Sequence, residues 1–232
     1  MILSNISKAI REQDWFAAAV EFVIVIAGVV IGFQVNAWNE SRQADARANE
    51  LLVRITEEFR TLEATLVSSE EIATAYEAAT ENVIRAIRED TIATTDPETM
   101  THWLGLVRHV GRPPTRSAVF AEMVASGELS LLPTVLRTAL SRFNQTIERN
   151  EYLWPEAASH LTGSTALFDA VDYTSLNDSR RALSFDPELV PLAESDLEAL
   201  VIYQGALRYA ISDSLENARE TLVLAEQTSD AD

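Results

Sequence analysis

The chain has 232 residues, carries a formal net charge of −18 and contains no cysteine. The acidic excess repels the phosphates of nucleic acids and of anionic lipids, so neither nucleic-acid binding nor polybasic docking on a membrane surface is expected. The absence of cysteine excludes disulfide bonds, thiolate metal sites and a cysteine nucleophile.

The composition predicts an all-α protein. Alanine, leucine and glutamate are abundant, glycine and proline occur only seven times each, and no segment shows sustained period-two alternation. The length suits one domain plus an anchor. We therefore expect an N-terminal transmembrane helix that continues into a long helix, which packs in a helical bundle with a long C-terminal helix.

Residues 1–14 are expected to form a short cytoplasmic N-terminus, and residues 15–38 a transmembrane helix. No charged residue occurs from Phe22 to Asn39, and tryptophans stand near both ends of the apolar run, as in interfacial belts. Two alternatives stay open, a cleaved signal peptide ending at Ala37 and a buried core helix. The signal peptide fits less well, because the region before Phe22 holds two cations and three anions.

Four residues of this segment are candidates for contacts between copies of the chain in the membrane. Gly28 and Gly32 have the small-xxx-small spacing that lets helices approach closely, while Glu21 and Gln34 are polar groups that can pair across helices. The flanking positive charges nearly balance, so they hardly decide the orientation. We expect a single-pass protein of a bacterial inner membrane, with a periplasmic C-terminal domain.

Residues 39–94 are expected to continue as one long helix, or as a helix with a soft break near Ser68-Ser69, because neither glycine nor proline occurs between Gly32 and Pro97. Apolar residues alternate there by four and three, which predicts coiled-coil-like packing. The predicted seam consists of Ala48, Leu52, Ile55, Phe59, Leu62, Leu66, Ser69, Ala73, Tyr76, Thr80, Val83 and Ile87.

A matching stripe predicts a second long helix at residues 195–227, paired antiparallel with the first and followed by a frayed tail at 228–232. Ser195-Asp-Leu-Glu198 has the form of a capping box at its start. The stripe consists of Leu197, Val201, Gln204, Leu207, Ile211, Leu215, Ala218, Leu222 and Ala225.

Shorter helices are predicted for residues 95–171, and a loop for 172–194. Thr95-Asp-Pro-Glu98 starts a helix that runs to about Val110, and a second helix covers 116–125, before a left-handed stop at Gly127. Pro133 starts a third helix, which reaches about Leu153. Trp154-Pro155 is expected to break it, and a fourth helix follows over 156–171.

Two patches resemble an uncharacterised bacterial family of small single-pass membrane proteins that carries a domain of unknown function. The residues 21–40, EFVIVIAGVVIGFQVNAWNE, are similar to the family's E-x-apolar-G-apolar-x-Q-x-N-x-W-N-E opening. Residues 113–129, together with Leu131-Leu132 and residues 136–140, resemble its P-x-R, S-G-x-L and L-R-x-x-L pattern. The resemblance covers about a quarter of the chain, and it implies a retained anchor but no catalytic residue.

One loop is the candidate ligand or partner site. Two arginines that flank Pro113-Pro114 are suited to clamp an anion at the start of the next helix, unless nearby acids pair with them. The candidate residues are Arg112, Arg116, Phe120, Glu122 and Met123.

A metal site is not expected. His102 and His109, with Glu98 a turn earlier, share one predicted helix face, and Glu156 and His160 form another same-face pair, but nothing in the sequence brings the two groups together.

No enzyme activity and no cofactor are expected, because hydrolase G-x-S-x-G and phosphate-loop G-x-x-x-x-G-K motifs are absent from the sequence. The preferred hypothesis is a membrane-anchored interaction or scaffold protein, whose partners are the bilayer and either further copies of itself or another membrane protein. The alternatives are an extracytoplasmic anion-binding or sensory domain and a hydrolase with an unrecognised site.

Overall fold

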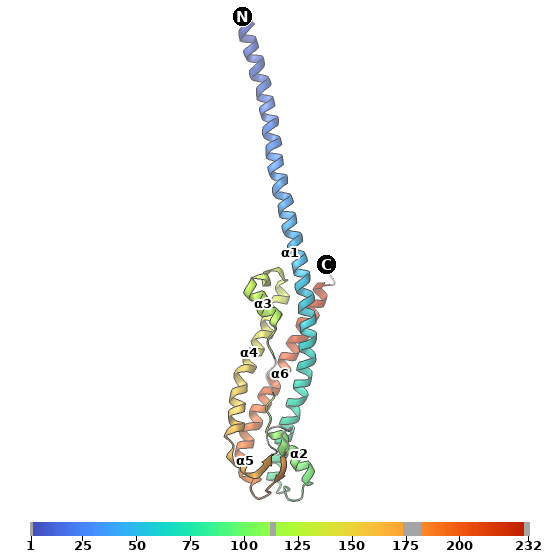
Figure 1. Cartoon of the computed structure of the whole chain (residues 1–232), viewed down its shortest axis with the longest axis vertical. Helices are drawn as coiled ribbons and strands as arrows, with labels where there is room; N and C mark the ends of the chain where they lie inside the picture. The colour runs from blue at the N-terminus through green and yellow to red at the C-terminus, as the bar shows by residue number, and fades with distance from the viewer. Residues whose placement is uncertain (1, 112–114, 174–181, 230–232) are drawn as a thin grey trace. The chain divides into compact units, whose positions relative to one another are not determined.

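The structure, a computed structural model, describes the backbone of residues 2–111, 115–173 and 182–229, and α-helices account for most of it (Figure 1). The chain divides into two compact units, Met1–Glu50 and Leu51–Asp232. The second unit contains the helical bundle. These observations agree with the predicted all-α fold.

Helix α1 (Ile2–Arg88) is continuous through Ser68-Ser69, so the predicted soft break does not occur. The helix ends at Arg88, six residues before the expected end at 94. Asp90 has a left-handed φ of 52°, and the N–H groups of Asp90 and Thr91 bind the carbonyls of Ile87 and Ala86. This is a Schellman stop, and aspartate tolerates its left-handed position without a glycine to mark it in the sequence.

Three long helices form the bundle, namely the bundle part of α1, α4 (Thr134–Gly163) and α6 (Glu194–Ser229). Side-chain pairs between α1 and α6 run in opposite directions along the two helices, from Arg60 with Glu226 to Arg88 with Glu198. Helices α4 and α6 are antiparallel as well, because Arg142 pairs with Glu220 and Arg149 pairs with Asp213. The predicted antiparallel pairing of the two heptad helices is confirmed (Figure 1).

Most of the predicted seam of α1 is buried within the chain, while Ala48, Ser69, Tyr76 and Ile87 are half-buried. Phe59 is fully buried and meets the ring of Phe143 of α4 edge to face, with 5.0 Å between centroids. Of the predicted α6 stripe, Val201 is half-buried and the other residues are buried. The seam residues from Leu52 to Leu66 are at most 7% exposed: Leu52, Ile55, Phe59, Leu62 and Leu66.

Polar side chains interrupt this core in two layers. In one, Asn150 of α4 donates to Ser214 Oγ (2.9 Å) of α6, and Ser214 donates to Thr146 Oγ1 (3.2 Å). In the other, Thr80 of α1 donates to Gln204 Oε1 of α6 over 2.7 Å. A helix that slipped along its neighbour would leave these buried groups unpaired at a cost of about 1–3 kcal/mol each, so the layers fix the register of the bundle.

The short helices begin and end largely where the capping signals predict. Asp96 accepts the N–H of Thr99 at the start of α2 (Pro97–Val107), and Ser117 accepts that of Phe120 at the start of α3 (Ala118–Ser126). Gly127 follows α3 with a left-handed φ of 78°, which glycine adopts without strain. The 3-10 helix η1 (Glu128–Leu131) comes next.

The predicted break at Trp154-Pro155 is wrong, because α4 continues through Pro155 to Gly163. Asn150 and Ala157, on either side of the proline, are fully buried, while Pro155 itself is exposed. Packing on both sides therefore holds the helix together across the missing N–H group. The break lies instead at Ser164, which caps α5 (Thr165–Ala170).

The predicted loop 172–194 is also partly wrong. Strand β1 (Val171–Tyr173) pairs antiparallel with β2 (Ala182–Phe185), with Val171 opposite Phe185. The 3-10 helix η2 (Val190–Ala193) then leads directly into α6 at Glu194, so the expected capping box at Ser195 does not start that helix. Strands of three and four residues are too short to show a period-two pattern.

Candidate functional site

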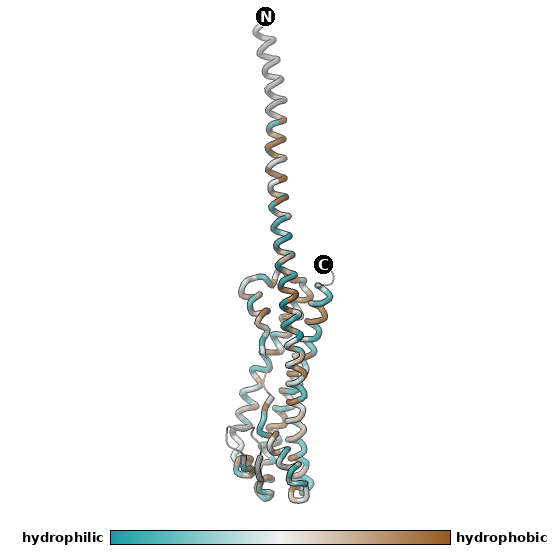
Figure 2. The backbone as a smooth tube through the Cα atoms, turned by 45° about the vertical axis from the view of Figure 1, so that its right-hand side comes forward, coloured by the Kyte–Doolittle hydropathy of each residue, from teal (hydrophilic) through white to brown (hydrophobic). Residues whose placement is uncertain are grey.

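The first unit presents an apolar helical surface. Every residue from Val20 to Trp38 is exposed, and Figure 2 shows a hydrophobic band on this part of α1 that is followed by hydrophilic residues. Among the described residues, the helix Ala19–Arg88 alone has the length and the apolar character needed to span a membrane, and its most apolar window has a mean hydropathy of 2.0. None of that window is buried, which contradicts the alternative of a buried core helix.

Three of the four candidate contact residues in this segment share a face of α1. At about 100° per residue, Glu21, Gly28 and Gly32 lie within roughly 40° of one another around the helix axis. Gln34 follows Gly32 by about 200°, so it lies on the opposite side and does not join this face. A Cβ atom placed on either glycine meets nothing within 4 Å, which leaves the surface open to a neighbouring helix.

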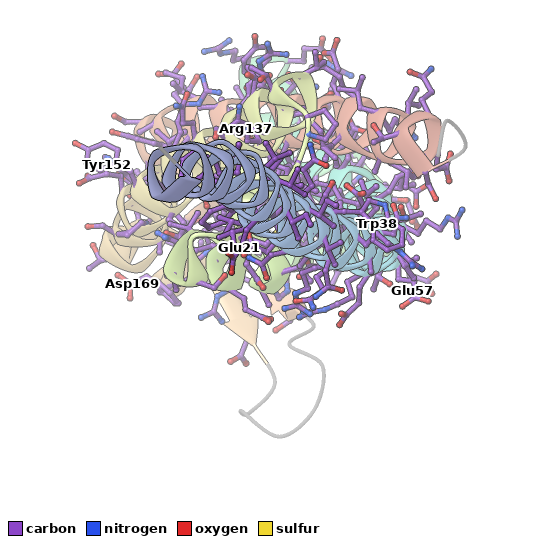
Figure 3. All side chains as sticks on the ribbon, turned by 90° about the horizontal axis from the view of Figure 1, so that it is seen from above. Glu21, Trp38, Glu57, Arg137, Tyr152 and Asp169 are labelled. Atoms are coloured by element: carbon purple, nitrogen blue, oxygen red, sulfur yellow. The ribbon has the colours of Figure 1, made fainter. Side chains whose placement is uncertain are left out.

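Polar and charged side chains line the end of the apolar run. Asn36 Nδ2 donates to Glu40 Oε1 over 2.6 Å, and the Arg42 guanidinium carbon lies 5.0 Å from the centroid of the Trp38 ring. Both pairs are separated by four residues, the spacing at which side chains meet on a helix. Figure 3 shows Glu21 and Trp38 projecting from different sides of the helix.

Of the two arginines of the expected anion clamp beside α3, the structure describes Arg116. Arg112 lies outside the described residues. Arg116 donates through Nε to Glu151 Oε1 (2.9 Å) and through Nη2 to Glu151 Oε2. These hydrogen bonds raise the pKa of Arg116 and lower that of Glu151. The guanidinium of Arg116 is thus paired with a carboxylate of α4.

The other three candidates of this loop serve the packing of α3 on the bundle. Glu122 pairs with Arg54 of α1, each terminal guanidinium nitrogen donating to one carboxylate oxygen. Met123 is fully buried in the core, and Phe120 is half-buried against it. Glu122, Met123 and Phe120 thus help to pack α3 against the bundle.

Sequence reasoning missed Glu58, which holds the start of α3. Its carboxylate, on α1, accepts the N–H of Ala118 at 2.6 Å and the hydroxyl of Ser117. An anion at a helix N-terminus satisfies backbone donors that have no partner within the helix. No local signal identifies this role, since 60 residues separate Glu58 from Ala118.

We expect Glu58→Ala to loosen α3 and to lower the free energy of unfolding by about 1–2 kcal/mol, because the first backbone N–H groups of the helix lose a charged acceptor. Hydrogen exchange should show faster exchange at the amides of residues 118–120. The matched control is Glu57→Ala, since Glu57 is exposed on the neighbouring position (Figure 3) and should change the stability by less than about 0.5 kcal/mol. Equal effects of the two variants would contradict the capping role.

The histidines do not form a metal site in the described part of the chain, where no group of three potential ligands comes together. The ring of His109 stacks on Tyr76 with 5.2 Å between centroids, and that of His160 stacks on Tyr203 at 4.4 Å. His102 is exposed. The two stacked imidazoles therefore pack on different tyrosines.

A groove of about 580 Å³ lies between α1 and α6. Its lining combines Ile84, Val201 and Ile202 with charged side chains. Arg88 in this groove is engaged by Glu194 and Glu198, and these hydrogen bonds raise the pKa of the guanidinium. The groove is open to solvent, and its Arg88 is held by carboxylates of α6.

Comparisons of the chain with protein-family models, with curated proteins and with solved structures found no match. The resemblance to the small single-pass membrane family therefore stays a prediction from two sequence patches.

Proposed function

We propose that the chain is a single-pass inner-membrane protein whose helical bundle is an interaction or scaffold module. The observation that carries this proposal is the exposed apolar surface of α1 from Val20 to Trp38, which is too large to leave in water. At about 25 cal/mol per Å² of apolar area, its transfer into hydrocarbon favours insertion strongly. The bundle that belongs to the same chain is then held at the membrane.

The N-terminus is proposed to lie in the cytoplasm and the bundle in the periplasm. The sequence contains no cysteine, so a thiol-specific reagent reacts only with a cysteine that is introduced by substitution. Ser195→Cys places one on an exposed position of α6, and Ser41→Cys places one just after the apolar segment. In intact spheroplasts an impermeant maleimide should label both variants, and lack of labelling before lysis would reverse the orientation.

The mature N-terminus tests the cleaved signal peptide. Intact mass of the protein recovered from membranes should show a chain that retains residues 1–37. A mass that begins at Trp38 would show that the apolar segment is removed, and the bundle would then have no anchor of its own.

Copies of the chain are proposed to associate through the face that contains Glu21, Gly28 and Gly32. Small residues allow close approach of helix backbones, and a glutamate within the membrane gains from a polar partner. We expect Gly28→Leu to weaken self-association of the full chain in lipid nanodiscs, as measured by crosslinking, while insertion is retained. Glu21→Gln should also retain insertion and should shift the crosslinked fraction.

The control for this prediction is Val30→Leu, which changes an exposed position of the same segment by one methylene on another side of the helix. Its crosslinked fraction should equal that of the unmodified chain. A chain that is monomeric at every protein-to-lipid ratio, and that retains no partner in pull-downs from mild detergent, would overturn the interaction role.

A further inference from the structure

Two groups at the end of the apolar run, Trp38 and Arg42, suit the headgroup layer of a bilayer. Trp38 is 61% exposed and stands three residues after Val35, the last valine, isoleucine or phenylalanine of the run. Arg42 is exposed as well. Indole rings favour the boundary between hydrocarbon and water, and guanidinium groups form paired hydrogen bonds with phosphate oxygens.

The side chain of Arg42 is directed back toward the apolar run. Its guanidinium carbon lies 5.0 Å from the ring centroid of Trp38, one helical turn closer to the N-terminus. Helical side chains tilt in this direction, so an arginine after a membrane segment reaches back to the lipid while its backbone stays in water.

The next two arginines are engaged elsewhere. Arg47 pairs with Glu50 at 2.7 Å, and Arg54 pairs with Glu122. Among the described residues, no carboxylate lies within ion-pair distance of Arg42. Its guanidinium lies over the Trp38 ring in a cation–π contact. Of the three described arginines that follow the apolar run most closely, Arg42, Arg47 and Arg54, Arg42 therefore has its hydrogen-bond donors available to a ligand.

The axial distances agree with a phosphate contact. With a rise of about 1.5 Å per residue, Trp38 lies roughly 4.5 Å beyond Val35 and the backbone of Arg42 roughly 10 Å beyond it. The headgroup layer on each side of the hydrocarbon is about 5–8 Å thick. Since the guanidinium is held at the level of the Trp38 ring, it lies within that layer although its backbone does not.

We propose that Trp38 and Arg42 form a binding site for a phospholipid headgroup, in which Arg42 holds the lipid phosphate and the Trp38 ring supports the guanidinium from one side. This inference rests on the proposed membrane anchor and adds to it a defined boundary of the membrane segment. The neighbouring carboxylate of Glu40 is engaged by Asn36, which lessens its repulsion of the phosphate.

Lys8 is the only lysine of the chain, and this allows a single-site test. In the double variant Lys8→Arg/Arg42→Lys, the lysine at position 42 is unique and its Nζ can be labelled with 15N. The full chain is reconstituted in vesicles of phosphatidylethanolamine and phosphatidylglycerol in a phosphate-free buffer. Solid-state dephasing of the 15N signal by 31P should report a separation of about 4 Å, as expected for a charge-assisted hydrogen bond to phosphate.

The matched control is Lys8→Arg/Arg88→Lys, because position 88 is engaged by Glu194 and Glu198 and should show no dephasing. Absence of dephasing at position 42, in protein that resists extraction from the vesicles by alkaline carbonate, would overturn the headgroup site and leave the anchor intact. Protein that carbonate extracts would overturn the anchor itself. Equal dephasing at positions 42 and 88 would indicate unspecific contact with lipid and would also overturn the site.

Discussion

Phe59→Ala is expected to lower the free energy of unfolding of the bundle by about 3–5 kcal/mol. Phe59 is fully buried, and its edge-to-face contact with Phe143 joins α1 to α4 in the middle of the predicted seam. Alanine removes the ring from both neighbours, and the surrounding helices close only part of the resulting cavity. Guanidinium unfolding of the full chain in dodecyl maltoside, followed by tryptophan fluorescence, measures the loss.

The control is Tyr152→Ala, which removes an aromatic ring that is 76% exposed on α4 (Figure 3). Its effect should stay within about 0.5 kcal/mol, because the ring has little buried area to lose. A comparable loss in the two variants would show that the Phe59 contact does not hold the bundle together. Phe143→Leu, which retains more of the buried volume, should fall between them.

The second large effect is expected in the apolar segment. Ile26→Arg combined with Val29→Arg should prevent insertion, because each arginine near the centre of a membrane helix costs about 2.5–3.5 kcal/mol on biological insertion scales. Both positions are exposed in the structure, so the substitutions disturb no packing within the chain. Alkaline carbonate should release the double variant into the soluble fraction, whereas the unmodified chain stays in the membrane pellet.

Ile26→Leu with Val29→Leu is the matched control, since it retains the apolar character at the same two positions. Circular dichroism should show that the helical content of the double arginine variant is largely unchanged, because the bundle in Leu51–Asp232 has its own core. Arginine variants that stay in the carbonate-resistant pellet would contradict the placement of the membrane segment.

The two long helices of the bundle and their pairing could be predicted because their signal is periodic. Apolar residues at intervals of four and three put one stripe on each helix, and burial of these stripes needs only that the two helices meet. Leu52, Phe59 and Leu215 are buried as that pattern requires. The caps at Asp96 and Ser117 act within three residues, which is why the starts of α2 and α3 were also close to expectation.

For the candidate loop beside α3, the sequence could predict the position of the residues but not their partners. The sequence indicates two arginines near a helix start, yet whether a guanidinium is free depends on the acids that the fold brings to it. Glu151 lies 35 residues from Arg116 along the chain, and Arg54 lies 68 residues from Glu122. Neither pair has a local signal. The first pair engages the guanidinium of Arg116, and the second engages the carboxylate of Glu122.

What the sequence by itself determined is the apolar segment, the helical class and the heptad faces, because each follows from composition or from a period of a few residues. Only the tertiary structure decided that α4 passes through Pro155 and that Glu58 caps α3. The physical reason is the same in both cases. A local preference worth a few kcal/mol, such as that of proline against a helix interior, is outweighed when buried neighbours on both sides hold the backbone in place. Likewise, an acceptor for a helix start is supplied by whichever side chain the packing brings there.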